Sequence, residues 1–214
     1  MNIAVITNSS LISDKQVRDD LQKADWVSLK IDAVSHDIWK KINRPHGSLQ
    51  LSTILEGLSD FSHSFKGYLA TETMLIKHTN DKSKELEKIA GFIHDLKPNK
   101  SYISIPTRPP AEPWVQMPTE KNLATAYHIF IEHDIPTEHL IGYEGNAFSS
   151  TGDLVEDILS ITAVHPLREE GINELLKKTG EGWEAVEDLL KEKEIIEIKH
   201  KNKKFYLRNL QKRT

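Results

Sequence analysis

The stretch WVSLKIDA, at residues 26–33, decides how the rest of this 214-residue chain is interpreted. Its apolar residues form a run typical of a buried β-strand, and Ser28, Lys30 and Asp32 occupy every second position. Because side chains alternate between the two faces of a strand, these three share one face. Burying them is costly unless they pair with one another or serve a ligand. The stretch therefore predicts a strand with a polar site on it, and an internal salt bridge without further role is the alternative.

Strand-like runs and helical stretches alternate around this strand up to about residue 145. The alternation favours an α/β fold with parallel strands and crossover helices, either a (β/α) barrel or an open doubly wound sheet. Four strands are few for either architecture. The predicted strands are residues 3–7, 26–33, 68–76 and 101–106, and the predicted helices are residues 14–24, 36–42, 49–65, 82–96 and 119–133.

The character of the chain changes after the glycine- and serine-rich residues 139–153. Three helical stretches follow, and residues 194–208 have the pattern of two strands around a turn at Lys201-Asn202. Three short helices and a hairpin are typical of a winged-helix domain. We therefore predict a (β/α) domain over residues 1–148 and a small winged-helix-like α+β module over residues 149–214.

The composition, 28% charged and 38% hydrophobic residues, is that of a globular protein. No apolar run approaches the roughly 20 residues that span a bilayer. The first residues lack the basic region and cleavage site of a signal peptide. We therefore expect a cytoplasmic protein with no membrane partner.

Charge is unevenly distributed along the chain, whose net charge is −4. Residues 191–214 hold nine lysines and arginines against three acidic residues, which indicates either a solvated basic tail or a surface for an acidic partner. If the partner is RNA or DNA, the candidate contacts are Lys199, Lys201, Lys203, Lys204 and Arg208.

The chain contains no cysteine. Disulfides, cysteine nucleophiles, cysteine-ligated zinc and clusters held by this chain's own thiolates are thereby excluded. The sequence also lacks a P-loop, a Gly-x-Gly-x-x-Gly turn, a Gly-x-Ser-x-Gly elbow and a His-Glu-x-x-His helix. We expect no metal site.

Further candidate residues lie at the expected carboxyl ends of strands, where parallel α/β folds place their sites. Asn8 follows the first strand, and Glu72 is a carboxylate within an otherwise apolar strand. Arg44 and Arg108 each precede a proline in an expected loop, which suits contact with an anion or a substrate. An unrelated barrel enzyme that uses Lys30, Asp32 and Glu72 for acid–base catalysis is one hypothesis.

Several strings in order resemble a branch of the radical S-adenosylmethionine (SAM) superfamily, the Fe–S oxidoreductases related to the radical enzymes of wybutosine synthesis. The strings are TNSSL (7–11), WVSLKIDAV (26–34), WKKINRPH (39–46), TETMLIKHTND (71–81), YISIPTRPPAEPW (102–114), LIGYEGNAF (140–148) and DILSITAVHPLRE (157–169). The resemblance implies a partial (β/α) barrel of radical SAM type, of which this chain holds strands three to six, followed by the winged-helix-like module. It also implies SAM-binding positions at Asn8, Ser28, Lys30, Asp32, Glu72 and Ser104.

The chain departs from the family where the family holds its cluster. The Cys-x3-Cys-x2-Cys segment, which ligates a [4Fe–4S] cluster, and the Gly-Gly-Glu-Pro-like stretch of the second strand are both missing. We therefore expect the C-terminal portion of a radical SAM enzyme, truncated, with an incomplete SAM site and no catalysis by itself. The alternative is a cluster-less binding or regulatory protein that contacts RNA or DNA through its basic C-terminus.

The loss of two preceding strands would make residues 3–7 an edge of the sheet. An edge strand presents unpaired backbone groups, and this one is also apolar. We expect residues 2–7 to be covered by another chain or by a rearranged segment, so that self-association through this strand is predicted.

Overall fold

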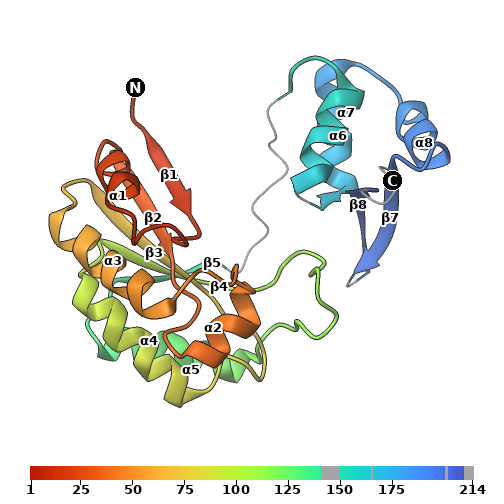
Figure 1. Cartoon of the computed structure of the whole chain (residues 1–214). Coiled ribbons are helices and arrows are strands. Elements are labelled where there is room, and N and C mark those ends of the chain that lie inside the picture. The colour runs from red at the N-terminus through yellow and green to blue at the C-terminus, as the bar shows by residue number, and fades with distance from the viewer. Residues whose placement is uncertain (141–149, 165, 201, 210–214) are drawn as a thin grey trace. The chain divides into compact units, whose positions relative to one another are not determined.

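The computed structural model describes residues 1–140, 150–164, 166–200 and 202–209. They divide into two compact units, each with its own hydrophobic core. The larger unit holds β1 to β5 and α1 to α5, and the smaller one holds α6 to α8 and β6 to β8 (Figure 1). Among the described helices, none has the length and apolar character needed to cross a membrane.

The larger unit is built on a five-stranded parallel sheet whose strands follow chain order, which confirms the α/β prediction. The fifth strand was not predicted, because its sequence Thr-Glu-His-Leu carries only one aliphatic residue. As an edge strand it is held by backbone pairing to β4 rather than by an apolar run. The strands are β1 (Ala4–Thr7), β2 (Trp26–Lys30), β3 (Tyr68–Met74), β4 (Lys100–Ser104) and β5 (Thr137–Leu140).

Helices α3, α4 and α5 cover one face of this sheet (Figure 1). Their apolar stripes, such as Leu58 and Phe61 of α3, share a core with the strand residues Leu29 and Ile103. Burial of these stripes is what stabilises the helices against the sheet. The helices of this unit are α1 (Lys15–Leu21), α2 (His36–Asn43), α3 (Leu51–Ser64), α4 (Ser83–Leu96) and α5 (Glu120–Glu132).

Among the strands that the structure describes, β1 forms one edge of the sheet, as predicted, and pairs with β2 alone. Its side chain Ile6 is 74% exposed, and the preceding Ile3 is 46% exposed. The crossover helix α1 contributes no buried residue, so it shields little of this edge from solvent. The apolar edge expected from the sequence is therefore present.

The smaller unit combines three helices with a three-stranded antiparallel sheet of order β6-β8-β7. Along the chain, one helix and one short strand precede two helices and a hairpin, which is the element order of a winged helix. The strand β6 escaped prediction because two residues are too few to give a periodic pattern. The elements are α6 (Leu154–Val164), β6 (Leu167–Arg168), α7 (Glu169–Thr179), α8 (Glu184–Lys191), β7 (Ile195–His200) and β8 (Lys203–Arg208).

Candidate functional site

A row of polar side chains crosses β2, β3 and β4 on the face opposite to the helices. Lys30 lies beside Glu72 in the sheet register, and its Nζ is 3.0 Å from Glu72 Oε1. Ser104 donates a hydrogen bond of 2.8 Å to the same carboxylate oxygen. The register of three parallel strands therefore joins Lys30, Glu72 and Ser104, which lie far apart in the sequence.

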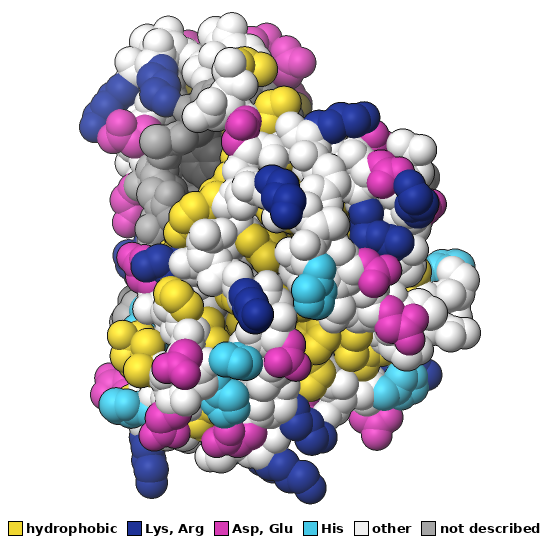
Figure 2. Space-filling view, turned by 90° about the vertical axis from the view of Figure 1, so that its left-hand side faces the viewer, with side chains coloured by type: hydrophobic (Ala, Val, Ile, Leu, Met, Phe, Trp, Pro, Cys, Tyr) yellow, Lys and Arg dark blue, Asp and Glu magenta, His cyan; other side chains and the backbone are white. Residues whose placement is uncertain are grey.

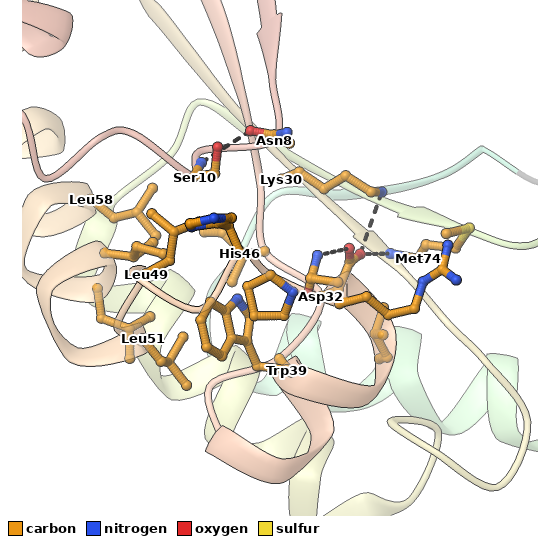
Figure 3. Close-up of a pocket in the computed structure, with 18 residues that line it drawn as sticks. Asn8, Ser10, Lys30, Asp32, Trp39, His46, Leu49, Leu51, Leu58 and Met74 are labelled. Atoms are coloured by element: carbon orange, nitrogen blue, oxygen red, sulfur yellow. Dashed lines mark hydrogen bonds and ion pairs between the residues drawn. The ribbon is translucent and has the colours of Figure 1, made fainter. Parts of the chain in front are cut away.

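Asp32 lies just beyond the end of β2 and is buried, with a side chain that is 1% exposed. Its Oδ1 accepts the backbone N–H of Met74 at 2.9 Å, and its Oδ2 accepts the Asn43 side-chain amide at 3.3 Å. Lys30 Nζ lies 3.4 Å from Oδ1, and these interactions are drawn in Figure 3. The carboxylate is thereby fixed between the ends of two strands and α2.

Lys30 keeps its positive charge in this setting. Its burial by itself would lower the pKa, but the carboxylates of Asp32 and Glu72 outweigh that effect and raise the pKa above its ordinary value. A general base needs a pKa near the working pH, so a lysine held in two ion pairs is poorly suited to that role. The acid–base hypothesis loses its most direct candidate, whereas a fixed cation suits the binding of an anionic group.

Asn80, for which the sequence predicted no role, organises the same end of the sheet. It is fully buried, and its amide donates to the carbonyl oxygens of Asp32 and Met74, both at 2.8 Å. Its Oδ1 accepts the N–H of Ile76 at 2.7 Å. Asn80 thus ties the carboxyl ends of β2 and β3 together, and an asparagine just past an apolar strand was the available signal.

The loop after β1 brings Asn8 to the same edge. Asn8 Oδ1 accepts the N–H of Ser10 at 3.0 Å, and Ser9 between them has a positive φ of 61°. The loop packs closely on α3, as the position of Gly57 shows: a Cβ at this residue would lie 2.6 Å from the carbonyl oxygen of Ile12. Glycine at position 57 is therefore what allows the loop to approach the helix and present Asn8.

These residues open onto a pocket of about 530 Å³ between the ends of β1 and β2, α2 and α3 (Figure 3). Its polar lining comes from the strand ends and from the segment after α2, and its apolar wall comes mainly from α2, α3 and the loop before α3. The size and the mixed lining are typical of a small-molecule site. Lining residues include Asn8, Ser10, Lys30, Asp32, Asn43, Arg44 and His46, with Trp39, Leu49, Leu51, Ile54, Leu55 and Leu58 on the apolar side.

Three of the six predicted SAM-binding positions line the pocket, namely Asn8, Lys30 and Asp32. Glu72 and Ser104 do not line it; Glu72 contacts the lining residue Lys30, and Ser104 contacts Glu72. The remaining position, Ser28, is buried two residues before Lys30.

The two arginines predicted to contact an anion are placed differently from each other. Arg44 lines the pocket and forms an ion pair with Glu112. Arg108 lies in the loop after β4 and is not among the residues that line this pocket.

The basic residues of the smaller unit are partly neutralised by neighbouring carboxylates. Lys204 Nζ lies 3.3 Å from Glu169 and 3.5 Å from Glu197, and Arg208 lies 3.3 Å from Glu194. Lys199 and Lys203 are exposed on β7 and β8, and the predicted contact Lys201 lies outside the described residues.

A [4Fe–4S] cluster of the family's kind does not fit this chain, because no cysteine is present to ligate it. In the part of the chain that the structure describes, no three histidine, aspartate or glutamate side chains are placed to hold a metal ion.

Comparison with known proteins found both longer relatives and structures of the same fold. No protein-family profile matches the chain. The solved structures that align with it include a domain of a pyruvate-formate lyase-activating enzyme from Bacteroides vulgatus (TM-score 0.53, 14% identity, 65% of this chain and 81% of that one) and a radical SAM methyltransferase from Sphaerobacter thermophilus (TM-score 0.52, 18% identity, 67% and 41%). The fold is that of a radical SAM-like partial barrel.

Among curated sequences, a UPF0026 protein from Methanocaldococcus jannaschii is 40% identical over 213 residues, 99% of this chain and 66% of that protein. A UPF0026 protein from Synechocystis is 33% identical over 105 residues, 49% of this chain and 39% of that one. A GTPase Obg from Brachyspira hyodysenteriae is 27% identical over 205 residues, 88% of this chain and 29% of that protein. UPF0026 proteins are a family of unknown function, and this radical SAM-like chain spans at most 66% of the length of these relatives.

Proposed function

We propose that the larger unit binds S-adenosylmethionine in the pocket at the ends of β1 and β2, as the C-terminal portion of a radical SAM enzyme. The observation that carries the proposal is the convergence of Asn8, Lys30 and Asp32 on one pocket, in a sheet with a radical SAM-like fold. In parallel α/β folds, ligands bind at this end of the strands.

The lining of the pocket suits the chemical groups of this cofactor. S-adenosylmethionine carries a carboxylate, an ammonium group, a ribose with two hydroxyls and an adenine ring. The Lys30 ammonium can pair with the carboxylate, and Asp32 and Asn8 offer oxygens to the ammonium group or the hydroxyls. The apolar wall with Trp39 and Leu58 suits a planar ring.

The radical chemistry of the family needs a [4Fe–4S] cluster that supplies an electron to the bound cofactor. This chain holds no cysteine for it, so we propose that the chain is catalytically silent by itself. The M. jannaschii relative is longer than the part that aligns with this chain, so it has residues outside that part. What this chain's residues contribute is the binding and orientation of the cofactor.

Calorimetric titration with S-adenosylmethionine, and with S-adenosylhomocysteine, tests the proposal. We expect binding that is weakened about tenfold or more by Asp32→Asn, because the neutral amide replaces a buried carboxylate that lines the pocket. Glu72→Gln is the matched control: it removes one charge from the same network but lies outside the pocket. Absence of binding by the unaltered chain would refute the proposal.

The control also separates two placements of the cofactor. If Glu72→Gln weakens binding more than Asp32→Asn does, the cofactor lies along the row of Glu72 and Ser104 rather than in the pocket. Quenching of the fluorescence of Trp39, which lines the pocket, should accompany binding and disappear in Trp39→Phe.

The alternative, a cluster-less regulatory protein that contacts RNA or DNA through the smaller unit, has less support. In a helix-turn-helix the second helix enters the major groove, and here that helix is α8. Its exposed residues include Glu184, Glu187 and Asp188, which repel phosphates. Salt-dependent nucleic-acid binding that is lost on Lys199→Glu or Lys203→Glu would favour this alternative.

A further inference from the structure

A second depression, which we call the basic pocket, adjoins the pocket described above. It has a volume of about 860 Å³, and the segment from Arg44 to Leu49 contributes residues to both pockets. Its lining includes Lys40 and Arg44, together with His36 and His46. No aspartate or glutamate is among its lining residues.

This concentration of positive charge is local. The chain as a whole carries a net charge of −4, and Figure 2 shows charges of both signs mixed over the face that it displays. The lining of this pocket gathers two permanent cations and two histidines and no acid, although Glu112 pairs with Arg44 and Asp37 lies 3.4 Å from His36 beside it. Its electrostatic potential favours a ligand with more than one negative charge.

The cations keep the capacity to bind such a ligand. Lys40 is exposed on α2, and its ammonium group makes no hydrogen bond or ion pair with any other described residue. Arg44 pairs with Glu112, but a guanidinium has five N–H donors and can serve a second partner. Lysine and arginine are the side chains that proteins use for phosphate, as a point charge and as a planar fork.

The surroundings of the cations suit the same kind of ligand. Leu51 and Ser52, the first residues of α3, line the basic pocket, and the first turn of this helix contains no acidic residue. The N-cap Gln50 makes no capping hydrogen bond through its side chain, so the pocket borders the electropositive end of the helix. Val34 and Leu55 add an apolar wall, which suits a phosphate attached to a less polar body.

We propose that the basic pocket binds the phosphate group of a small ligand next to the S-adenosylmethionine pocket. We further propose that this ligand is the second reactant of a SAM-dependent reaction, and this step rests on the proposed function. The binding of phosphate itself is independent of the proposed function, because it depends on Lys40 and Arg44 rather than on Lys30 and Asp32.

Titration of the isotope-labelled chain with inorganic phosphate, followed by NMR, tests the proposal. We expect saturable shifts of the amides of Leu51 and Ser52, and an affinity about tenfold weaker in Lys40→Gln, because one charge-assisted contact is lost. Lys66→Gln is the matched control: it removes the same charge from an exposed position just after the other end of α3, far from the lining of the pocket. The control should bind phosphate as the unaltered chain does.

Three outcomes would overturn the proposal. They are no saturable binding of phosphate, equal weakening by Lys40→Gln and Lys66→Gln, or shifts at residues remote from the basic pocket. A parallel titration with a short RNA separates the two sources of a phosphate group. Tight binding of RNA that Lys40→Gln does not weaken, together with no response to inorganic phosphate, would also refute a small-ligand site.

The same titrations distinguish this proposal from the proposed function. Lys40→Gln should leave the affinity for S-adenosylmethionine unchanged, and Asp32→Asn should leave phosphate binding unchanged. If the chain binds phosphate through Lys40 but does not bind S-adenosylmethionine, the phosphate site is supported and the proposed function is refuted. If it binds S-adenosylmethionine but not phosphate, only the phosphate site is refuted.

Discussion

Single carboxylates fix both units of this molecule through several hydrogen bonds each. In the larger unit Asp32 joins the ends of two strands to α2. In the smaller unit Asp157 accepts the hydroxyl of Ser150 at 2.7 Å, as well as the N–H and the hydroxyl of Thr151. Each side chain is a local structural requirement, and in the larger unit it also lines the candidate site.

The bonds of Asp157 predict how the stability of the smaller unit changes with pH. The hydroxyl of Ser150, together with Thr151, lowers the pKa of Asp157 below its ordinary value of about 3.8. A carboxyl group with a lowered pKa stabilises the fold fully above its unfolded-state pKa, and this contribution is lost as the pH falls toward the folded-state pKa.

We therefore expect Asp157→Asn to destabilise the smaller unit at pH 7 and to flatten the decrease in its stability below about pH 5. Urea unfolding of the unaltered protein and of the Asp157→Asn variant across this pH range measures the effect. If the unfolding free energies of the two proteins changed in parallel with pH, Asp157 would not be the group responsible. Glu156→Gln, at the exposed neighbouring position on α6, is the matched control and should keep the original profile.

At the scale of elements, the decisive feature is the order of strands in the sheet. The α/β character and four of the five strands of the larger unit followed from the sequence, because their apolar runs are distinct. The fifth strand did not follow from the sequence, since TEHL by itself has no pattern of a strand and is extended because it pairs with β4. The polar row of Lys30, Glu72 and Ser104 likewise depends on register, which no single strand encodes.

The exposed edge β1 predicts self-association of the chain. Ile3 and Ile6 are exposed beside a row of backbone groups that pair on one side only. Such an edge binds another strand, from a second copy or from a further segment of a longer protein. We expect the mass measured by light scattering to increase with concentration, and Ile6→Lys to keep the chain monomeric.

The control for the edge is Ile131→Lys, which places the same charge at an exposed isoleucine of α5, away from β1. It should associate as the unaltered chain does. A chain that stays monomeric at every concentration would show that the exposed edge alone does not drive association.

On the scale of the whole molecule, a radical SAM-like fold occurs here without any cysteine that could ligate a [4Fe–4S] cluster. The chain spans 66% of its M. jannaschii relative. We expect anaerobic reconstitution with iron and sulfide to give no visible absorbance of a protein-bound [4Fe–4S] cluster. A stable chromophore that stays with the chain through gel filtration would overturn the argument from the missing ligands.

The sequence by itself determined the α/β class, the helical module with its terminal hairpin, the shared face of Ser28, Lys30 and Asp32, and the absence of thiolate ligands. These are local properties, set by residue type and by spacing along one element. Only the tertiary structure decided that Glu72 pairs with Lys30 and accepts a hydrogen bond from Ser104, while Asn8, Asp32 and Arg44 line a pocket. It also placed Trp39 and Asn80 at that end of the sheet, because parallel pairing and crossover helices join positions that the sequence keeps far apart.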